Sequence, residues 1–158
     1  MAANVNPKLL YQQLLDASVL PPEFGEAIQR YKCGSGTFRM NVALRELPDF
    51  HARPGIQAQP HHASGIVFAP SLAYMDVAWH SAVAQGYAAQ PIVEMLIPSV
   101  VDDTLAPHGA HVASLFCQQF DPAADWATLK EPAVQAIFDV VQSYCPNFRD
   151  ALLGWRAL

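Results

Sequence analysis

The chain has 158 residues, of which 52% are hydrophobic and only 15% are charged, and its formal net charge is −5. This acidic balance gives no cluster of Lys and Arg to neutralise phosphates, so we expect no nucleic-acid partner. The longest apolar runs fall short of the ~20 residues that cross a bilayer, so we expect no membrane span.

Two helices are predicted at the start of the chain. Asn6 followed by Pro7 is a typical helix opening, because the Asn side chain can accept from free amides and proline fits the first helical position. A second helix is expected after Pro21-Pro22, and the segment from Gly34 to Gly36 predicts a turn. Residues 1–31 are therefore interpreted as a helical lead-in to a sheet-and-helix layer at 32–158.

The pattern changes to a period of two after this turn. Residues 37–44 alternate between an apolar face and a largely polar face that carries Arg39 and Asn41. Residues 48–60 are rich in proline and predict an irregular segment, and a short strand is expected at 65–69. Ser71 can cap a helix that runs to about Gly86. Its predicted inward stripe comprises Met75, Ala78, Trp79, Ala82 and Val83.

Two further strands and a helix complete the predicted elements. Residues 92–97 and 110–120 read as strands close enough in sequence to be antiparallel neighbours. Glu131-Pro132 is expected to open a helix that ends near Pro146. The inward residues of that helix would be Val134, Ile137, Phe138 and Val141. The predicted fold class is α+β, with an antiparallel or mixed sheet of about four strands and helices packed on one face.

Self-contained catalytic motifs are missing from this sequence. A dinucleotide-binding GxGxxG follows a strand, whereas the Gly34–Gly36 segment precedes one and has Arg39 where the third glycine is needed. The adjacent His61 and His62 cannot easily aim at one metal ion, so no metal site is assigned. Cys117 lies mid-strand among apolar neighbours, as an inert core thiol would.

Five segments together resemble a known family. They are Lys32–Leu44, Pro60–His62, Glu94–Ser99, Asp103–His111 and Tyr144–Asp150. In this order they are similar to the phytoene-desaturase-like FAD-dependent oxidoreductases, specifically their pyridine nucleotide-disulfide oxidoreductase domain-containing group. The likeness covers nearly the whole chain.

The resemblance implies that this chain is an internal part of a longer enzyme. Family members hold FAD with an N-terminal GxGxxG region and a C-terminal glycine-rich segment, and neither has a counterpart here. The chain would correspond to the substrate-binding layer, which lies over the flavin. The implied activity is a dehydrogenase or desaturase reaction, in which hydride passes from an apolar substrate to the flavin. The isolated chain is expected to be inactive and to hold no cofactor, because its FAD-binding domain is absent. That domain is its expected partner.

Five residues are candidates for lining a substrate or a domain interface, and no catalytic residue is named. Arg39 and Asn41 could face the substrate or simply face solvent. Glu94 stands among apolar neighbours, so it needs a polar partner or water. His62 and His111 lie in the family-like segments, although each could simply hydrogen-bond a turn carbonyl.

Other classes of function stay open at this stage. A free-standing α+β binding module, dimeric through an exposed sheet face, is the main alternative, and a metal-dependent hydrolase is a third.

Three cysteines without CxxC spacing suit free thiols in a reducing compartment. No secretory signal is visible at the N-terminus. We therefore expect a cytoplasmic protein, or one in an organelle matrix.

Overall fold

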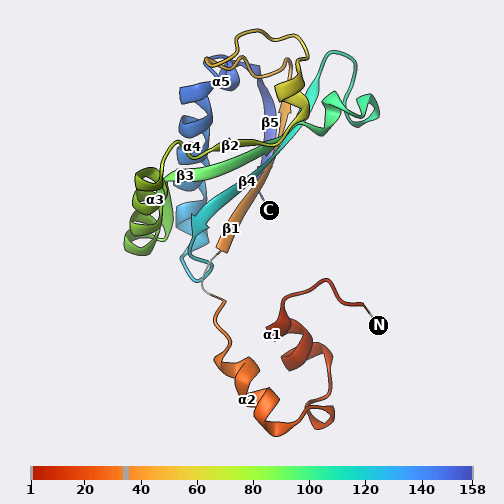
Figure 1. Ribbon diagram of the computed structural model, residues 1–158, viewed down its shortest axis with the longest axis vertical. Helices are drawn as coiled ribbons and strands as arrows, with labels where there is room; N and C mark the ends of the chain where they lie inside the picture. Colours follow the sequence, from red (N-terminus) through yellow and green to blue (C-terminus); the bar gives the residue numbers. More distant parts are fainter. Residues whose placement is uncertain (1, 34–35, 158) are drawn as a thin grey trace. The chain divides into compact units, whose positions relative to one another are not determined.

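The computed structural model describes residues 2–33 and 36–157 and divides into two compact units, Met1–Gly34 and Ser35–Leu158. The first unit holds α1 (Pro7–Leu9), which continues as a π-helical turn over Leu10–Leu14, and α2 (Pro22–Arg30) (Figure 1). Both predicted helices are confirmed. The Asn6 side chain accepts from the backbone N–H of Lys8 at 2.8 Å, as the capping pattern predicts. The predicted turn at Gly34–Gly36 has two of its residues outside the described part of the chain.

The second unit is built on a five-stranded antiparallel sheet. Its strands are β1 (Gly36–Leu44), β2 (Ile66–Phe68), β3 (Tyr87–Leu96), β4 (His111–Phe120) and β5 (Leu152–Ala157). They lie side by side in the order β2-β3-β4-β1-β5, and each neighbouring pair is antiparallel (Figure 1). The α+β class and the antiparallel pairing of the two strands at 92–97 and 110–120 are confirmed. The prediction of about four strands is wrong, because β5 was missed.

The missed strand has a weak sequence signal. β5 starts directly after α5 (Phe148–Ala151) with no turn residue between them, and Gly154 interrupts its middle. Glycine is unfavourable inside a strand. Pairing with β1 overrides this preference, since Trp155 lies opposite Val42 and packs edge-on against Phe138.

The core lies between one face of the sheet and α4 (Trp126–Tyr144) (Figure 1). All four residues predicted to face inward from this helix are buried: Val134, Ile137, Phe138 and Val141. The predicted start at Glu131 is wrong, because the helix begins at Trp126 and contains Pro132. Asp125 caps it by accepting from the N–H of Ala127 at 3.1 Å, and Trp126 packs on the rings of Phe38 and Phe120. These contacts outweigh the hydrogen bond that Pro132 removes.

The helix α3 (Leu72–Gln85) packs on β3 with a different stripe from the one predicted. Its ends are as expected, because Ser71 Oγ accepts from the N–H of Tyr74 and Gly86 closes the helix with φ of 91°. Ala78 and Ala82 are buried against Ala88 and Ile92. The predicted inward positions of Met75, Trp79 and Val83 are wrong, since these side chains are 41%, 47% and 68% exposed. Two small alanines make the contact with β3 and leave the large side chains outside it.

Burial alternates along the strands and separates two faces of the sheet. On β1, Phe38, Met40 and Val42 are buried toward α4, whereas Arg39 and Asn41 are exposed on the other side. We call that other side the open face. It carries Val67, Glu94, Leu96, Ser114, Phe116, Gln118, Arg39, Asn41 and Arg156. Within residues 2–33 and 36–157, no helix combines the length and apolarity that a bilayer crossing requires.

Candidate site on the open sheet face

The strand register brings three of the five predicted site residues onto the open face. One row across the sheet runs Val67, Glu94, Phe116, Arg39, and the next runs Leu96, Ser114, Asn41, Arg156. Directly paired residues on one face have Cβ atoms ~5 Å apart. Arg39, Asn41 and Glu94 therefore belong to one surface, and each of them is exposed.

Arg39 is held on this surface by two contacts from β4. Its guanidinium carbon lies 5.2 Å from the centre of the Phe116 ring, and its Nη1 donates to Ser114 Oγ at 3.3 Å. A stacked guanidinium is a fork of five donors whose orientation is restricted. Most of those donors remain available to a ligand, because one of them is used by Ser114.

Glu94 lies on the other side of Phe116 from Arg39. Its Oε1 accepts from Nε2 of Gln118 at 3.1 Å, and among the described residues it has no cationic partner. This exposed carboxylate keeps an oxygen free to accept from a ligand or from another domain. Exposure explains how a carboxylate is tolerated in an otherwise apolar strand segment.

A shallow hollow of about 270 Å³ lies on the open face between these charges. Its lining is largely apolar and includes Val67, Leu96 and Phe116 together with Arg39 and Glu94. Glu94 lies between Val67 and Phe116 in the first row. Leu96 is 55% exposed and Val67 is 61% exposed. The hollow is close to the lower end of the size range of small-molecule sites.

The two histidines lie away from the open face. His62 is fully buried: one ring nitrogen, Nε2, is 2.9 Å from the carbonyl oxygen of Pro48, and the other, Nδ1, is 3.2 Å from the N–H of Gln59, which donates to it. His111 pairs with Leu44, on the side of the sheet that faces α4. Its Nδ1 is 3.3 Å from Ser99 Oγ. The structure therefore does not bring the five predicted residues together.

His61 completes a small imidazole cluster beside His62. The two rings are 4.0 Å apart, and the His61 ring meets Phe50 edge-on. Both ring nitrogens of His61 are buried without a hydrogen-bond partner among the described residues. Burial lowers the pKa of His61, and His62 and Arg53 lower it further. Burial also lowers the pKa of His111, with a smaller contribution from His62. The lowered pKa values favour the neutral forms of His61 and His111.

No group of three or more His, Cys, Asp or Glu side chains in the described residues could hold a metal ion. Cys117 and Cys145 are buried and free, whereas Cys33 is exposed. Burial raises the pKa of the Cys145 thiol to about 12, with a further contribution from Asp49, and burial also raises that of Cys117. The two core thiols are therefore poor nucleophiles.

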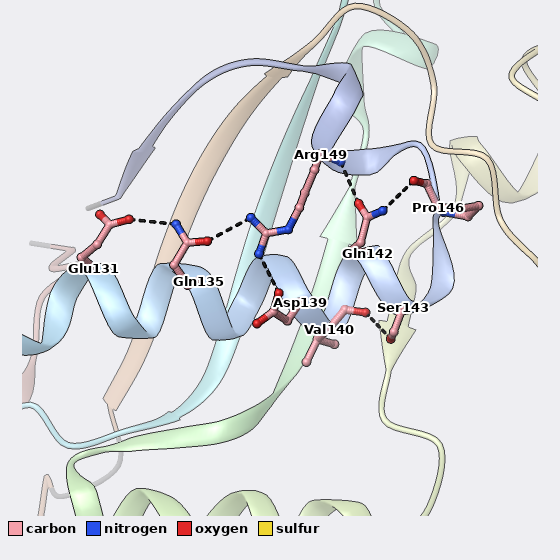
Figure 2. A network of polar contacts seen from close by, with 8 residues as sticks. All are labelled: Glu131, Gln135, Asp139, Val140, Gln142, Ser143, Pro146 and Arg149. Carbon is pink, nitrogen blue, oxygen red and sulfur yellow. Dashed lines mark hydrogen bonds and ion pairs between the residues drawn. The ribbon is translucent and has the colours of Figure 1, made fainter.

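The segment Tyr144–Asp150 has a structural role in this fold. Arg149 donates from Nη1 to Gln135 at 2.9 Å and from Nη2 to Asp139 at 2.7 Å, and its backbone N–H donates to Gln142 (Figure 2). Asn147 accepts from the N–H of Asp49 at 2.8 Å and donates to Glu46. These contacts join the end of α4 to α5 and to the loop after β1.

Several residues of the open face were not predicted as site residues. The period-two pattern of β4 could have shown that Ser114 and Phe116 share a face with each other. It could not have shown that they lie beside Arg39, because register is set by the whole fold. Arg156 was missed together with its strand, β5.

The described residues do not fit a dinucleotide site. Such a site needs a parallel strand followed by a glycine-rich turn and a helix N-terminus, whereas every neighbouring strand pair here is antiparallel. A Cβ at Gly36 would lie 2.7 Å from the carbonyl oxygen of Phe120, so this glycine serves the close approach of two strands.

The fold and the open face define an α+β layer in which α4 covers one sheet surface and the other surface has exposed strand residues. No protein-family model matches the chain. It is 31% identical over 159 residues to the rat protein named pyridine nucleotide-disulfide oxidoreductase domain-containing protein 2, and 30% identical over 158 residues to the mouse protein of that name. Each alignment covers 94% of this chain and 27% of the relative. The chain is thus related to oxidoreductase-domain proteins and spans about a quarter of their length.

Proposed function

We propose that this chain is the substrate-side layer of an FAD-dependent oxidoreductase of the dehydrogenase or desaturase type. The observation that carries the proposal is the open face, which contains a hollow and presents both charged and apolar side chains that are exposed. A surface of this kind suits contact with another domain and with a ligand between the two. The resemblance to phytoene-desaturase-like enzymes and the names of the rat and mouse relatives support the same function.

In this proposal the work is divided between two parts of the enzyme. The flavin, held by a separate FAD-binding domain, supplies the redox chemistry. The residues of this chain bind an apolar part of the substrate in the hollow, orient it with Arg39, Asn41 and Glu94, and exclude water from the covered surface. None of these residues is assigned a proton transfer.

The proposal is tested by asking whether the open face becomes covered in a longer enzyme. A chimera would replace the aligned segment of the rat relative with this chain, with Cys33→Ser removing the one exposed thiol. Leu96→Cys then places a thiol on the open face, and Glu131→Cys places a matched thiol on the exposed side of α4. We expect Leu96→Cys to be alkylated at least about tenfold more slowly in the chimera than in the isolated chain.

The control thiol at position 131 should react at similar rates in both proteins. The chimera should retain bound flavin, and the isolated chain should be colourless and leave the absorbance of added FAD unchanged. Equal alkylation of Leu96→Cys in a folded, flavin-containing chimera would overturn the proposal. A flavin spectrum in the isolated chain would overturn the assignment of FAD to a separate domain.

A free-standing binding module is the second candidate. The observation that favours it is the complete core of the second unit, in which Met40, Leu44, Met95, Leu115 and Phe148 are fully buried without any further domain. A domain with its own core can fold alone. In that case the isolated chain would bind a ligand on the open face, and the chimera would show no protection at position 96.

A further inference from the structure

The open face carries two arginines on β1 and β5, and on the side of β2, β3 and β4 it carries apolar side chains on both sides of the exposed Glu94. Asn41 on β1 lies directly between Ser114 on β4 and Arg156 on β5, and Arg39 is two residues from Asn41 on the same strand face. Trp155, the neighbour of Arg156, packs on Phe138 on the other side of the sheet. Arg156 therefore points to the open face, where it is exposed. The diagonal spacing of Arg39 and Arg156 corresponds to ~7–8 Å between Cα atoms.

The strands of the sheet carry a net positive charge, whereas the whole chain is negative. The five strands contain two arginines, Arg39 and Arg156, and a single carboxylate, Glu94, although the chain carries a formal net charge of −5. Neither arginine forms an ion pair with any residue in the described part of the chain. Glu94 is two strands from Arg39, which corresponds to roughly 10 Å. At this distance water and salt screen most of the attraction between two exposed charges.

Apolar side chains adjoin this basic cluster. Phe116 lies under the Arg39 guanidinium and also lines the hollow, together with Leu96 and Val67. The Glu94 carboxylate lies between Phe116 and Val67 and accepts from Gln118. A ligand whose charged end contacts Arg39 would therefore place its next atoms on Phe116 and in the hollow. Such a ligand must be anionic at one end and apolar beyond it.

We infer that the open face binds an amphipathic carboxylate, with its head at Arg39, Asn41 and Arg156 and its hydrocarbon part in the hollow. This inference rests on the proposed function and narrows its substrate class from apolar to carboxylate-headed molecules. A guanidinium fork matches the two oxygens of a carboxylate, and the side chains of Asn41 and Ser114 add neutral donors beside it. The apolar walls favour a hydrocarbon chain over a bare inorganic anion.

The test uses the intact 158-residue chain with octanoate as the probe. Amide chemical shifts are followed during titration, with octanol as the neutral probe of equal chain length and inorganic phosphate as the headgroup-only probe. We expect octanoate to shift the amides of β1, β4 and β5 that surround Asn41 and to saturate in about the millimolar range. Octanol should bind at least about fivefold more weakly, and phosphate should not displace octanoate at equal concentration.

Substitutions test whether octanoate binds to the two arginines and not to other cationic side chains. Arg39→Gln and Arg156→Gln should each weaken octanoate binding about fivefold or more, and Arg39→Lys should weaken it less than Arg39→Gln. Lys130→Gln is the matched control, because Lys130 lines a different hollow beside Trp126. It should leave the affinity unchanged. The amide spectrum of each variant also reports whether it is folded.

Three outcomes would overturn the inference. They are equal binding of octanol and octanoate, displacement of octanoate by phosphate at equal concentration, and loss of binding in Lys130→Gln but not in Arg39→Gln. Failure of this test leaves the proposed function standing if Leu96→Cys is still protected in the chimera. Loss of that protection with octanoate binding intact would instead favour a free-standing carboxylate-binding module.

Discussion

At the scale of single residues, Arg149 makes a dense set of contacts in this fold. Its guanidinium donates to Gln135 and Asp139 and lies 5.5 Å from the centre of the Phe138 ring. Asp139 is 74% exposed, so water screens the ion pair and reduces its contribution. The hydrogen bond to Gln135 and the packing of the side chain on Phe138 remain as the main stabilising contacts.

We therefore expect Arg149→Ala to lower the free energy of unfolding by about 1–2 kcal/mol. Urea denaturation followed by circular dichroism measures this change. His80→Ala is the matched control, since His80 and Asp76 are both 72% exposed and 3.5 Å apart. It should change the free energy by less than about 0.5 kcal/mol. Equal effects of the two substitutions would show that the Arg149 contacts do not stabilise the fold.

We expect the stability of the fold to depend on pH through His61. The pKa of His61 is lowered in the folded state, so the unfolded chain takes up a proton at this residue at higher pH than the folded chain does. The pKa of a histidine in the unfolded chain is about 6.5. The stability that depends on a neutral His61 is therefore complete above this pH, and it is lost as the pH falls toward the lower pKa of the folded chain. His111 acts in the same direction.

We expect the thermal midpoint of the chain to fall when pH is lowered from about 7.5 to about 5.5. His61→Phe should make this fall smaller, because phenylalanine can keep the edge-on packing with Phe50 but cannot be protonated. Scanning calorimetry across that range gives the comparison. His80→Phe is the control for replacing a histidine by phenylalanine at an exposed position. An unchanged slope in His61→Phe would rule out His61 as a source of the effect.

At the scale of elements, the sequence predicted the helices and strands whose ends or faces are defined by local signals. The cap at Ser71 and the glycine at 86 set both ends of α3, and alternation located β1. The inward stripe of α3 could not be predicted, because apolar residues lie all around this helix and periodicity does not say which side meets β3. The start of α4 was missed because Pro132 looked like a first-turn proline.

The outer side of α3 is an apolar stripe formed by Leu72, Met75, Trp79 and Val83, all of them exposed. In the isolated chain we expect this stripe to drive self-association at high concentration. Trp79→Gln combined with Val83→Gln should raise the monomer fraction in sedimentation velocity experiments, because the two changes remove much of the exposed apolar area.

The matched control combines Val101→Gln with Leu105→Gln. Val101 is 77% exposed and Leu105 is 47% exposed, and both lie outside α3. This pair should leave the monomer fraction unchanged. If Leu96→Gln raises the monomer fraction and the α3 variants do not, association occurs through the open face of the sheet, as the sequence led us to expect.

At the scale of the whole molecule, the sequence predicted the layer but not the site. Arg39, Asn41 and Glu94 could be placed on exposed strand positions, since alternation separates the two sides of a strand. Their proximity depends on β4 lying between β1 and β3, and no local pattern encodes that order. His62 and His111 were grouped with them because of the family-like segments, whereas the fold places His62 in the buried imidazole cluster and His111 on the α4 side of the sheet.

The strand order also has a consequence for biosynthesis. β1 hydrogen-bonds to β4 and β5, whereas β2 and β3 are made before either partner. During translation the apolar side chains of Phe38, Met40 and Val42 thus leave the ribosome long before the strands that pair with β1 exist. Non-local pairing of this kind slows folding and prolongs the exposure of the apolar side chains of β1. The nascent polypeptide should therefore engage chaperones at β1 until synthesis has passed β4.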